Sequence, residues 1–378
     1  MSSKLLPILP GATLGILGGG QLGRLFTLAA RSMGYRVMVL DPDAASPAGQ
    51  MADAHIQADY TDAAALKQLG EQCAAITTEF ENVPAASLIE LARHCRVAPS
   101  ADAVAIAQDR SHEKTWLADN GFATAPFAVI NNETELEAGL AKTGAPALLK
   151  VSRFGYDGKG QARVATPDEA RAAFKAFGNQ ACVLEGFVKL DAEVSVVLAR
   201  DDAGECALFP LAENQHANGI LDISIVPARV SNALAQQARE MARAVAHKLG
   251  YVGIMAVEFF IADDRLLINE VAPRPHNSGH YTLDACVTDQ FEQQVRVLCG
   301  LPLGDTRLLS PVVMLNMLGD RWQNGGPNWN ALLVHPNIKL HLYGKQAARP
   351  GRKMGHCNVL DVDLDAAIQL AEQMRDAL

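Results

Sequence analysis

Two glutamates in the middle of the chain are the first candidates for chemistry. Glu258 and Glu270 lie in the apolar segments Gly253–Ile261 and Leu266–Val271, which flank Ala262–Asp264 and predict a β-hairpin. Opposed positions on one sheet face place Cβ atoms about 5 Å apart. Two buried carboxylates at that distance repel unless a cation or a shared proton lies between them. Oxygen ligands of this kind suit Mg²⁺ that is held partly by phosphate groups.

Two questions about this hairpin stay open in the sequence. An odd or even turn length decides whether Glu258 faces Glu270 or Asn269. The alternative to a metal site is an edge hairpin with two exposed glutamates. The surrounding residues IMAVEFFI and LLINEVA are apolar, and they favour burial.

A glycine-rich loop follows another predicted strand, Ala147–Val151. Lys150 ends that strand, and Lys159 lies within the loop GYDGKGQ at residues 155–161. Backbone N–H groups and two ammonium groups suit a triphosphate, and glycine permits the loop to close over it. The Walker A pattern G-x-x-x-x-G-K-[ST] is absent. A glycine-rich hairpin turn with a solvated lysine is the alternative.

A second glycine motif lies near the N-terminus. Gly18–Gly23 fits G-x-G-x-x-G between a predicted strand, Leu14–Leu17, and a predicted helix, Leu22–Met33, and Asp41 ends the next strand. This is the dinucleotide fingerprint, and it supports a rival hypothesis, an NAD-dependent oxidoreductase. The same N–H groups would serve any phosphorylated ligand at a helix N-terminus, so the motif alone does not decide the function.

Two polar clusters follow the hairpin. His276 and His280 have the i, i+4 spacing of a zinc helix, but Pro275 and Gly279 oppose a helix and the glutamate of H-E-x-x-H is missing. The cluster Arg274–His280 better suits a small anion beside a metal–phosphate site. A basic run lies near the C-terminus, for which a solvated surface patch is the alternative: Lys345, Arg349, Arg352 and Lys353.

Composition limits the classes of function. A length of 378 residues suits two or three domains. The net charge of −9 argues against a nucleic-acid partner or a polybasic membrane role. Seven scattered cysteines without a C-x-x-C pair indicate reduced thiols. Pro7 and Pro10 interrupt the apolar N-terminus, which speaks against a signal peptide, and no apolar run is long enough to span a bilayer. A cytoplasmic location is expected.

The order of elements predicts an α/β fold that is α+β in part. Strands and helices alternate over residues 13–99, which predicts a parallel sheet covered on both faces, with Gly18–Gly23, Asp41 and Glu79–Glu81 along its carboxyl edge. Later segments predict helices and strands in a different order: Asp109–Asn120, Pro167–Phe177, Cys182–Val188, Glu193–Arg200 and Ser231–Leu249. Expected domains are residues 1–105, residues 106–304 with a lid at about 124–190, and residues 305–378.

Together these motifs resemble the ATP-grasp superfamily and, within it, the carboxyaminoimidazole ribonucleotide synthetases. The segments that carry the resemblance are GGGQLGR at 18–24, TEFENVP at 78–84, GYDGKGQ at 155–161, GIMAVEFF at 253–260, NEVAPRPHNSGH at 269–280 and RPGRKMGH at 349–356. NEVAPRPHNSGH and GYDGKGQ are the most specific of them. The resemblance implies an N-terminal Rossmann-like domain, a central ATP-grasp domain with a lid and a small C-terminal domain.

The resemblance also implies an activity. It is that of a ligase that uses ATP and Mg²⁺, or Mn²⁺ in its place, and no biotin. The ligase joins bicarbonate, through carboxyphosphate, to the 5-amino group of aminoimidazole ribonucleotide in purine synthesis, and it releases ADP and phosphate. The implied partners are these small molecules and a second copy of the chain, with no nucleic acid and no membrane. A sister ribonucleotide transformylase that uses formate is an alternative beside the oxidoreductase.

Site residues carried over from the resemblance fall into groups. Those implied for ATP are Arg110, Lys150, Gly155, Tyr156, Asp157, Gly158, Lys159, Gly160, Gln161, Glu185, Gly186, Phe187, Val188, Glu193, His216, Asn269 and Glu270. Metal ligands would be Glu258 and Glu270. The catalytic pocket for bicarbonate and carboxyphosphate would comprise Arg274, His276, Asn277 and Lys353. The ribonucleotide would bind to Gly20, Gln21, Glu79, Tyr156, Asp157, Lys345 and Arg352.

Overall fold

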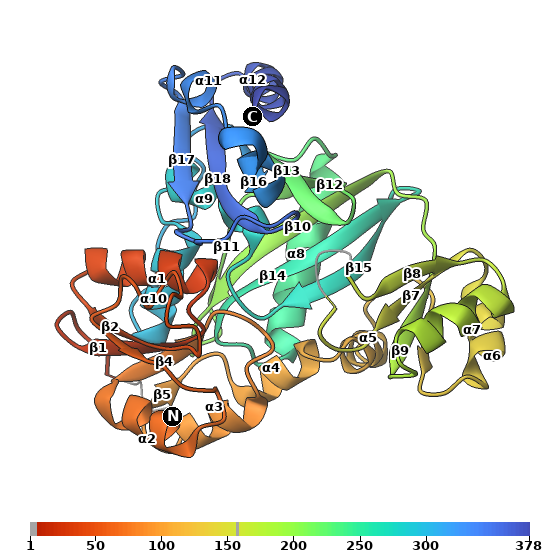
Figure 1. Ribbon diagram of the computed structural model, residues 1–378, viewed down its shortest axis with the longest axis horizontal. Helices are drawn as coiled ribbons and strands as arrows, with labels where there is room; N and C mark the ends of the chain where they lie inside the picture. The colour runs from red at the N-terminus through yellow and green to blue at the C-terminus, as the bar shows by residue number, and fades with distance from the viewer. Residues whose placement is uncertain (1–5, 156–158) are drawn as a thin grey trace.

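Three sheets make up the molecule, which is a computed structural model that describes residues 6–155 and 159–378 (Figure 1). The first sheet is parallel, with strand order β3-β2-β1-β4-β5. Its strands are β1 (Thr13–Leu17), β2 (Arg36–Leu40), β3 (Ala54–Ile56), β4 (Ala75–Thr78) and β5 (Arg96–Val97). The helices between them are α1 (Gln21–Ser32), α2 (Ala63–Gln72) and α3 (Ala85–Leu91), and α4 (Ala101–Ala107) follows. Because both faces are covered, strands such as RVMVL are apolar almost throughout.

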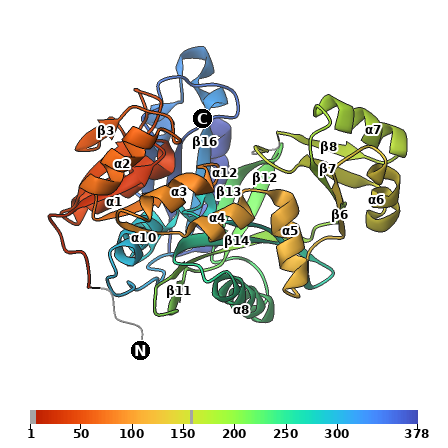
Figure 2. The ribbon, with the colours of Figure 1, turned by 90° about the horizontal axis from the view of Figure 1, so that it is seen from below.

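The second sheet lies on the opposite side of the molecule and is antiparallel, with order β6-β9-β7-β8. Its strands are β6 (Phe127–Ile130), β7 (Ala147–Val151), β8 (Gln161–Val164) and β9 (Cys182–Gly186). Apolar side chains of α6 (Glu135–Thr143) and α7 (Pro167–Ala176) cover one of its faces and give it a core of its own. Helix α5 (Arg110–Asp119) lies between this sheet and the rest of the molecule (Figures 1 and 2).

The third sheet has nine strands, all paired antiparallel. They are β10 (Ala192–Arg200), β11 (Cys206–Leu208), β12 (Ala212–Ala217), β13 (Ile220–Val226), β14 (Gly253–Ala262), β15 (Arg265–Ala272), β16 (Val312–Leu318), β17 (Ile338–Leu342) and β18 (Lys353–Leu360). Pairing of β13 with β16 joins the central part of the chain to its C-terminal part in one sheet. The domain boundaries expected at residues 105 and 304 stay a prediction.

Helices on the third sheet complete the fold. Long helix α8 (Asn232–Lys248) packs on β10, β14 and β15, and α12 (Leu364–Ala377) packs on β16 and β18. Shorter segments connect the strands: 3₁₀ turn η1 (Asn277–Gly279), α9 (Thr282–Ala285), α10 (Gln290–Leu298), 3₁₀ turn η2 (Gly319–Gly325) and α11 (Trp329–Leu333). The expected mixed α/β fold is confirmed. In the part of the chain that the structure describes, no helix is both long and apolar enough to cross a membrane.

The β14–β15 hairpin answers the question that the sequence left open. Its turn has two residues, Asp263 and Asp264, with φ of 49° and 56°, the left-handed conformation that type I′ turns need. A regular ladder from this turn would pair Glu258 with Asn269. A bulge next to Glu258 adds one residue on β15, so that Glu258 pairs with Glu270 instead. Asn269 and Glu270 therefore both reach the same cavity, although they are neighbours in the chain.

Candidate active site

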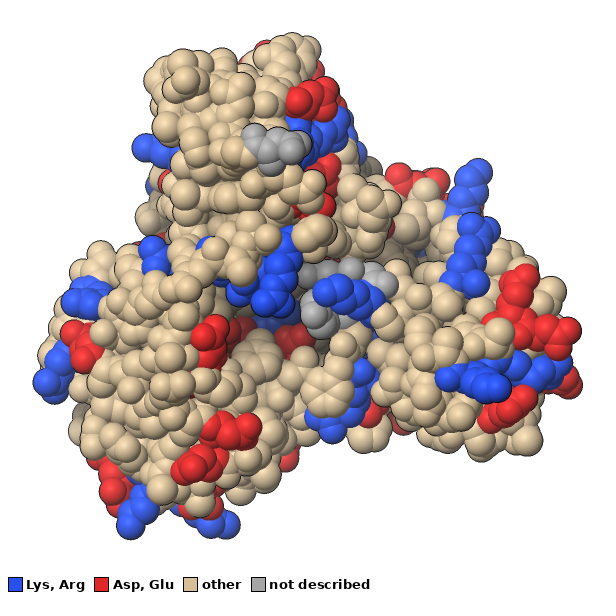
Figure 3. Space-filling view, in the orientation of Figure 1, with Lys and Arg blue, Asp and Glu red and all other residues tan. Residues whose placement is uncertain are grey.

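A cavity of about 950 Å³ lies where the three sheets meet. Its walls come from all three sheets and from helix α5. They comprise the glycine turn before α1, strands β7 and β8 of the second sheet (called the lid below), the β14–β15 hairpin and the start of β18. In the space-filling view the centre of the molecule is hollowed, with lysine and arginine side chains beside the opening (Figure 3). A smaller pocket of about 210 Å³ adjoins it and shares Gly20, Glu79, Phe80, Lys345 and Arg352.

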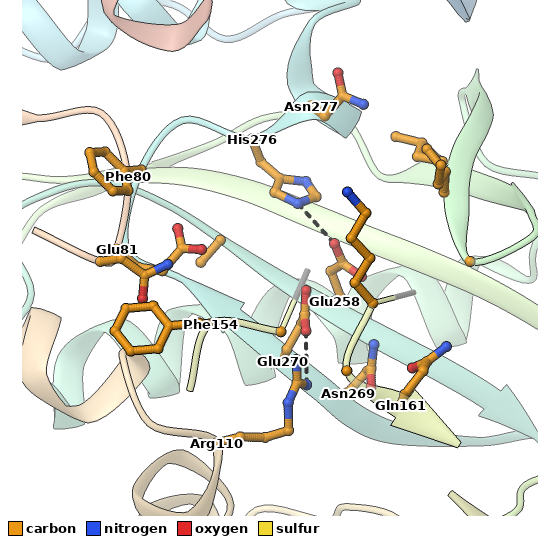
Figure 4. A pocket seen from close by; sticks show the side chains of 18 of the residues that line it. Phe80, Glu81, Arg110, Phe154, Gln161, Glu258, Asn269, Glu270, His276 and Asn277 are labelled. Atoms are coloured by element: carbon orange, nitrogen blue, oxygen red, sulfur yellow. Dashed lines mark hydrogen bonds and ion pairs between the residues drawn. The ribbon is translucent and has the colours of Figure 1, made fainter. Parts of the chain in front are cut away.

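The carboxylates of the hairpin each have a cationic or potentially cationic partner. Oε1 of Glu258 lies 2.9 Å from Nε2 of His276, and Oε2 of Glu270 lies 3.2 Å from Nη1 of Arg110 (Figure 4). Burial opposes ionisation of Glu258, but His276 and the other nearby cations outweigh it and lower the pKa of Glu258 to about 2. Oδ1 of Asn269 is buried beside them without a hydrogen-bond partner. Carboxylate and amide oxygens are the ligands that a hard divalent cation prefers. The amide oxygen of Asn269 has no hydrogen-bond partner and is therefore available to such a cation.

Lys150 is held by a buried carboxylate of the lid. Nζ of Lys150 lies 3.1 Å from Oε2 of Glu185, and Nζ of Lys114 lies 3.3 Å from the same oxygen. Burial opposes the charge of Glu185, but Lys114, Lys150 and Arg110 outweigh it and lower its pKa to about 2. The Glu185 side chain does not line the cavity, whereas Lys150 does. Glu185 therefore acts on the cavity through Lys150.

Helix α5 connects the lid to the hairpin. Toward the lid, the backbone N–H of Arg110 donates to the carbonyl of Ser152, and the hydroxyls of Ser111 and Ser152 lie 2.6 Å apart. Toward the hairpin, Oε1 of Glu113 accepts from the N–H of Val271. Burial raises the pKa of Glu113 to about 8. The helix thus fastens the strand that carries Lys150 to the strand that carries Glu270.

Arg110 on this helix was among the predicted site residues, whereas Glu113 and Lys114 were not. The three residues have i, i+3 and i+4 spacing, which places them on one helix face. That spacing was a usable signal. It pointed to a polar face, but only tertiary contacts show that the face is buried between two sheets.

The remaining nucleotide residues divide into two sets. Gly155, Lys159, Gly160, Gln161, Glu193 and His216 line the cavity, whereas Gly186, Phe187 and Val188 do not. Tyr156, Asp157 and Gly158 lie outside the described residues. Burial opposes the charge of His216, but Glu193, 3.0 Å away, outweighs it and raises the pKa of His216. The predicted strand Cys182–Val188 ends at Gly186.

The glycine turn differs from the sequence expectation. Its N–H groups were expected to approach a phosphate, but carboxylates accept them. Gly19 N donates to Oδ2 of Asp41 at 2.6 Å. Gly20 N donates to one oxygen of Glu79 at 2.5 Å, and Gly23 N to the other at 2.6 Å. An approaching phosphate would meet two carboxylates in place of free amides, so the phosphate-binding expectation is wrong for these groups.

The ribonucleotide and bicarbonate candidates converge on the same cavity. Gly20, Gln21, Glu79, Lys345 and Arg352 line it on one side, and Arg274, His276, Asn277 and Lys353 line another part. Nζ of Lys345 donates to Oε1 of Gln21 at 2.9 Å. The guanidinium of Arg274 pairs with Glu81, a residue of the TEFENVP segment that had no assigned role.

Among these residues, Asn277 gives the clearest indication that a ligand binds here. Its side chain is buried, and neither its carboxamide oxygen nor its nitrogen has a hydrogen-bond partner. A buried amide of this kind is costly unless a ligand completes it. It follows His276, whose ring points toward Glu258 (Figure 4). His280, the second histidine of the motif, is buried against Phe291 and does not line the cavity.

Comparison with known proteins gives a consistent result. The ATP-grasp domain model matches residues 115–291, the ribonucleotide synthetase preATP-grasp domain model matches residues 11–108, and the phosphoribosylaminoimidazole carboxylase C-terminal domain model matches residues 312–370. The N5-carboxyaminoimidazole ribonucleotide synthase of Brucella melitensis is 47% identical over 350 residues, which cover 92% of this chain and 96% of that one.

Two solved structures have the same overall fold as this chain. N5-carboxyaminoimidazole synthetase from Staphylococcus aureus, complexed with ADP, is 37% identical, with a TM-score of 0.92 over 98% of this chain and 99% of that chain. The synthase from Aspergillus clavatus, in complex with ADP and 5-aminoimidazole ribonucleotide, is 31% identical, with a TM-score of 0.89 over 97% of this chain and 98% of that chain.

Loss of Lys114 is expected to destabilise the protein. Replacement Lys114→Met leaves Glu185 buried with less compensation, which should cost about 3–5 kcal/mol of unfolding free energy. Because the folded pKa of Glu185 lies near 2, below its ordinary 4.5, its contribution is present above pH 4.5 and is lost as pH falls toward 2. Thermal unfolding should therefore show a difference between wild type and variant that narrows over this range.

The matched control is Lys67→Met, which breaks the exposed pair with Glu71. Removing that surface pair should cost less than about 1 kcal/mol. Equal thermal midpoints for the two variants would contradict the role of Lys114.

Proposed function

The chain belongs to the N5-carboxyaminoimidazole ribonucleotide synthases, a family of ATP-grasp ligases, and we propose how its cavity carries out their reaction. An oxygen of bicarbonate attacks the γ-phosphorus of ATP, ADP leaves, and carboxyphosphate forms. The 5-amino group of aminoimidazole ribonucleotide then attacks the carboxyl carbon, or the CO₂ that carboxyphosphate releases. A nitrogen–carbon bond forms, and phosphate and a proton leave. The product is N5-carboxyaminoimidazole ribonucleotide, an intermediate of purine biosynthesis.

The observation that carries this assignment is the convergence of the Asn277 pocket and the hairpin carboxylates in one cavity. Asn277 has unused donors and an unused acceptor, and His276 beside it is paired to Glu258. Bicarbonate offers both hydrogen-bond donors and acceptors, so it suits a carboxamide of this kind. Arg274 and Lys353 line the same part of the cavity and supply positive charge for carboxyphosphate.

The nucleotide lies, in this proposal, between the lid and the hairpin. Lys150 and Lys159 face its phosphates, and the Glu193–His216 pair lies where its ribose would bind. Mg²⁺ or Mn²⁺ would be held by Glu258, Glu270 and the unpartnered oxygen of Asn269, and it would neutralise charge on the transferring phosphoryl group. Glu185 positions Lys150. Gly186, Phe187 and Val188, at the end of β9 and just after it, would contact the nucleotide from beyond the cavity wall.

The ribonucleotide lies, in this proposal, against the glycine turn. Glu79, fixed by the amides of Gly20 and Gly23, offers acceptors to its hydroxyl groups. Lys345 and Arg352 border both the main cavity and the adjoining pocket, and they would bind its phosphate. The carboxylates on the glycine amides also argue against the oxidoreductase alternative, because a dinucleotide pyrophosphate would have no amides to bind.

We also propose a cytoplasmic homodimer. All seven cysteines are free thiols in the structure, which is consistent with a reducing compartment. The dimer rests on analogy with related ligases. Neither feature is needed for the cavity, since every group assigned above comes from one chain.

Phosphate release tests the reaction itself. With ATP and Mg²⁺, release should depend on both aminoimidazole ribonucleotide and bicarbonate, and ¹³C-labelled bicarbonate should yield labelled carbamate on the 5-amino nitrogen. Substrate requirements separate the alternatives, since a transformylase would need formate and an oxidoreductase would change NADH absorbance. Turnover with formate and none with bicarbonate would reverse the assignment.

Replacement of Glu270, which the bulge places opposite Glu258, tests the metal site. Glu270→Gln should remove most ATP turnover and leave the fold intact, because a divalent cation held by Glu270 would stabilise the charge that develops in the transition state by several kcal/mol. Glu292→Gln is the control, since Glu292 pairs with Arg296 on α10 away from the cavity. Near-normal phosphate release by Glu270→Gln at saturating Mg²⁺ would contradict the metal assignment.

Truncation of Arg352 tests the ribonucleotide site. A charge-assisted hydrogen bond contributes roughly 1.5–3 kcal/mol, so Arg352→Ala should raise the KM for aminoimidazole ribonucleotide about tenfold or more. The KM for ATP should hardly change, because Lys150 and Gln161 line the main cavity but not the adjoining pocket that Arg352 borders. Lys339→Ala, an exposed cation of β17, is the matched charge control. If Arg352→Ala raised the KM for ATP alone, the basic run would belong to the nucleotide.

A further inference from the structure

Helix α10 carries two fully buried glutamines that make the same unusual contact with different loops. Gln290 and Gln293 have no exposed surface. Each uses its carboxamide to bridge the N–H and the C=O of a single residue elsewhere in the chain, His276 and Gly304 respectively. His276 lines the catalytic cavity, and Gly304 does not. Gln290 therefore makes this contact with a residue of the cavity, and Gln293 makes the equivalent contact with a residue outside the cavity.

The contact between Gln290 and His276 has well-defined geometry. The N–H of His276 donates to Oε1 of Gln290 at 2.9 Å, and Nε2 of Gln290 donates to the carbonyl of His276 at 2.9 Å. His276 has φ of −122° and ψ of 151°, an extended conformation in which N–H and C=O point to the same side. One carboxamide can therefore satisfy both groups, as a neighbouring strand would.

Three further observations show that the loop is built around Gln290. The second hydrogen on Nε2 of Gln290 is directed at Nδ1 of His280, 3.1 Å away, which leaves the His280 proton on Nε2. A Cβ atom on Gly279 would lie 2.6 Å from Oε1 of Gln290, so only glycine leaves room for it. Thr282 accepts from the backbone N–H of Gln290 at 3.1 Å and donates to the carbonyl of Gly279.

The consequence concerns the two groups that face the cavity. With its backbone held by Gln290, His276 keeps its ring for Ser278 on one side and for Glu258 on the other. Asn277 follows directly, and its carboxamide has no protein partner to orient it. Its place is set by the backbone on either side, and Gln290 holds that backbone at His276 and donates to the ring of His280.

We propose that Gln290 is a positioning residue for the bicarbonate and carboxyphosphate pocket, acting through the backbone of His276. It does not line the cavity and touches no reacting atom. The idea rests on the proposed function for its catalytic consequence, whereas the contact itself can be tested without any substrate. Displacement of catalytic groups by about 1 Å can cost a hundredfold in rate.

The experiment compares Gln290→Met with Gln293→Met. Both changes keep the side-chain length, remove one bridging carboxamide from the same helix and leave a backbone N–H and C=O without partners, so their cost in thermal stability should be similar. Gln290→Met alone should lower kcat/KM for bicarbonate, by roughly tenfold to a hundredfold. The KM for ATP should stay unchanged in both variants.

Hydrogen–deuterium exchange gives the readout that needs no activity. In Gln290→Met, amides of the segment 274–280 should exchange faster than in wild type, and in Gln293→Met only amides near Gly304 should do so. If Gln290→Met folds poorly, Gln290→Glu and Gln293→Glu provide a second matched pair, in which an oxygen replaces the donor to the backbone carbonyl.

The outcomes separate the two proposals. A wild-type protein without bicarbonate-dependent turnover overturns the proposed function, and exchange at segment 274–280 still decides whether Gln290 holds the loop. An active wild type in which the Gln290 and Gln293 variants lose the same kcat/KM for bicarbonate overturns the positioning role. Faster exchange at 274–280 together with a selective loss of kcat/KM supports it.

Discussion

Repulsion between Glu258 and Glu270 is the constraint on which the rest of the site depends. The two carboxylates occupy opposed positions of one hairpin, with side-chain exposures of 11% for Glu258 and 36% for Glu270, and two negative charges so close together repel. His276 compensates the first and Arg110 compensates the second. These two partners come from a loop after the hairpin and from a helix far before it, so two segments that are distant in the sequence meet at one sheet. The proposed divalent cation would complete the same balance of charge.

The same principle orders the layers around the cavity. Glu185 is ionised in the lid because Lys114 and Lys150 lie beside it, and Glu79 is held at the glycine turn by backbone amides. Glu185 thus fixes cations from behind the cavity wall, whereas Glu79 lines the cavity and binds the amides of the glycine turn. Lysine and arginine side chains thus gather around the cavity, where the proposed phosphates and carboxyphosphate would bind, although the chain as a whole carries a net charge of −9. Positioning of charge, without a nucleophilic side chain, is what phosphoryl transfer requires.

Most elements could be predicted because their signals are local. The strand Ala147–Val151 was predicted with its observed bounds, and the helices α5, α7 and α8 were predicted to within about one residue at each end, since capping residues such as Asp109, Thr166 and Ser231 mark their starts. The family resemblance likewise supplied about half of the residues that line the cavity. Residues that act from behind the wall, such as Lys114 and Gln290, escaped notice. Their sequence contexts are those of ordinary helices.

By itself, the sequence determined which kinds of groups this protein brings to its ligand: paired carboxylates, glycine loops, lysines and an Arg–His–Asn cluster. Only the tertiary structure decided how they are used. A one-residue bulge placed Glu270, and not Asn269, opposite Glu258. In the folded chain the glycine N–H groups donate to the carboxylates of Asp41 and Glu79, although the motif is that of a phosphate-binding loop. The reason is physical: periodicity and turn chemistry act over a few residues, whereas register, burial and charge compensation depend on partners that folding brings from distant parts of the chain.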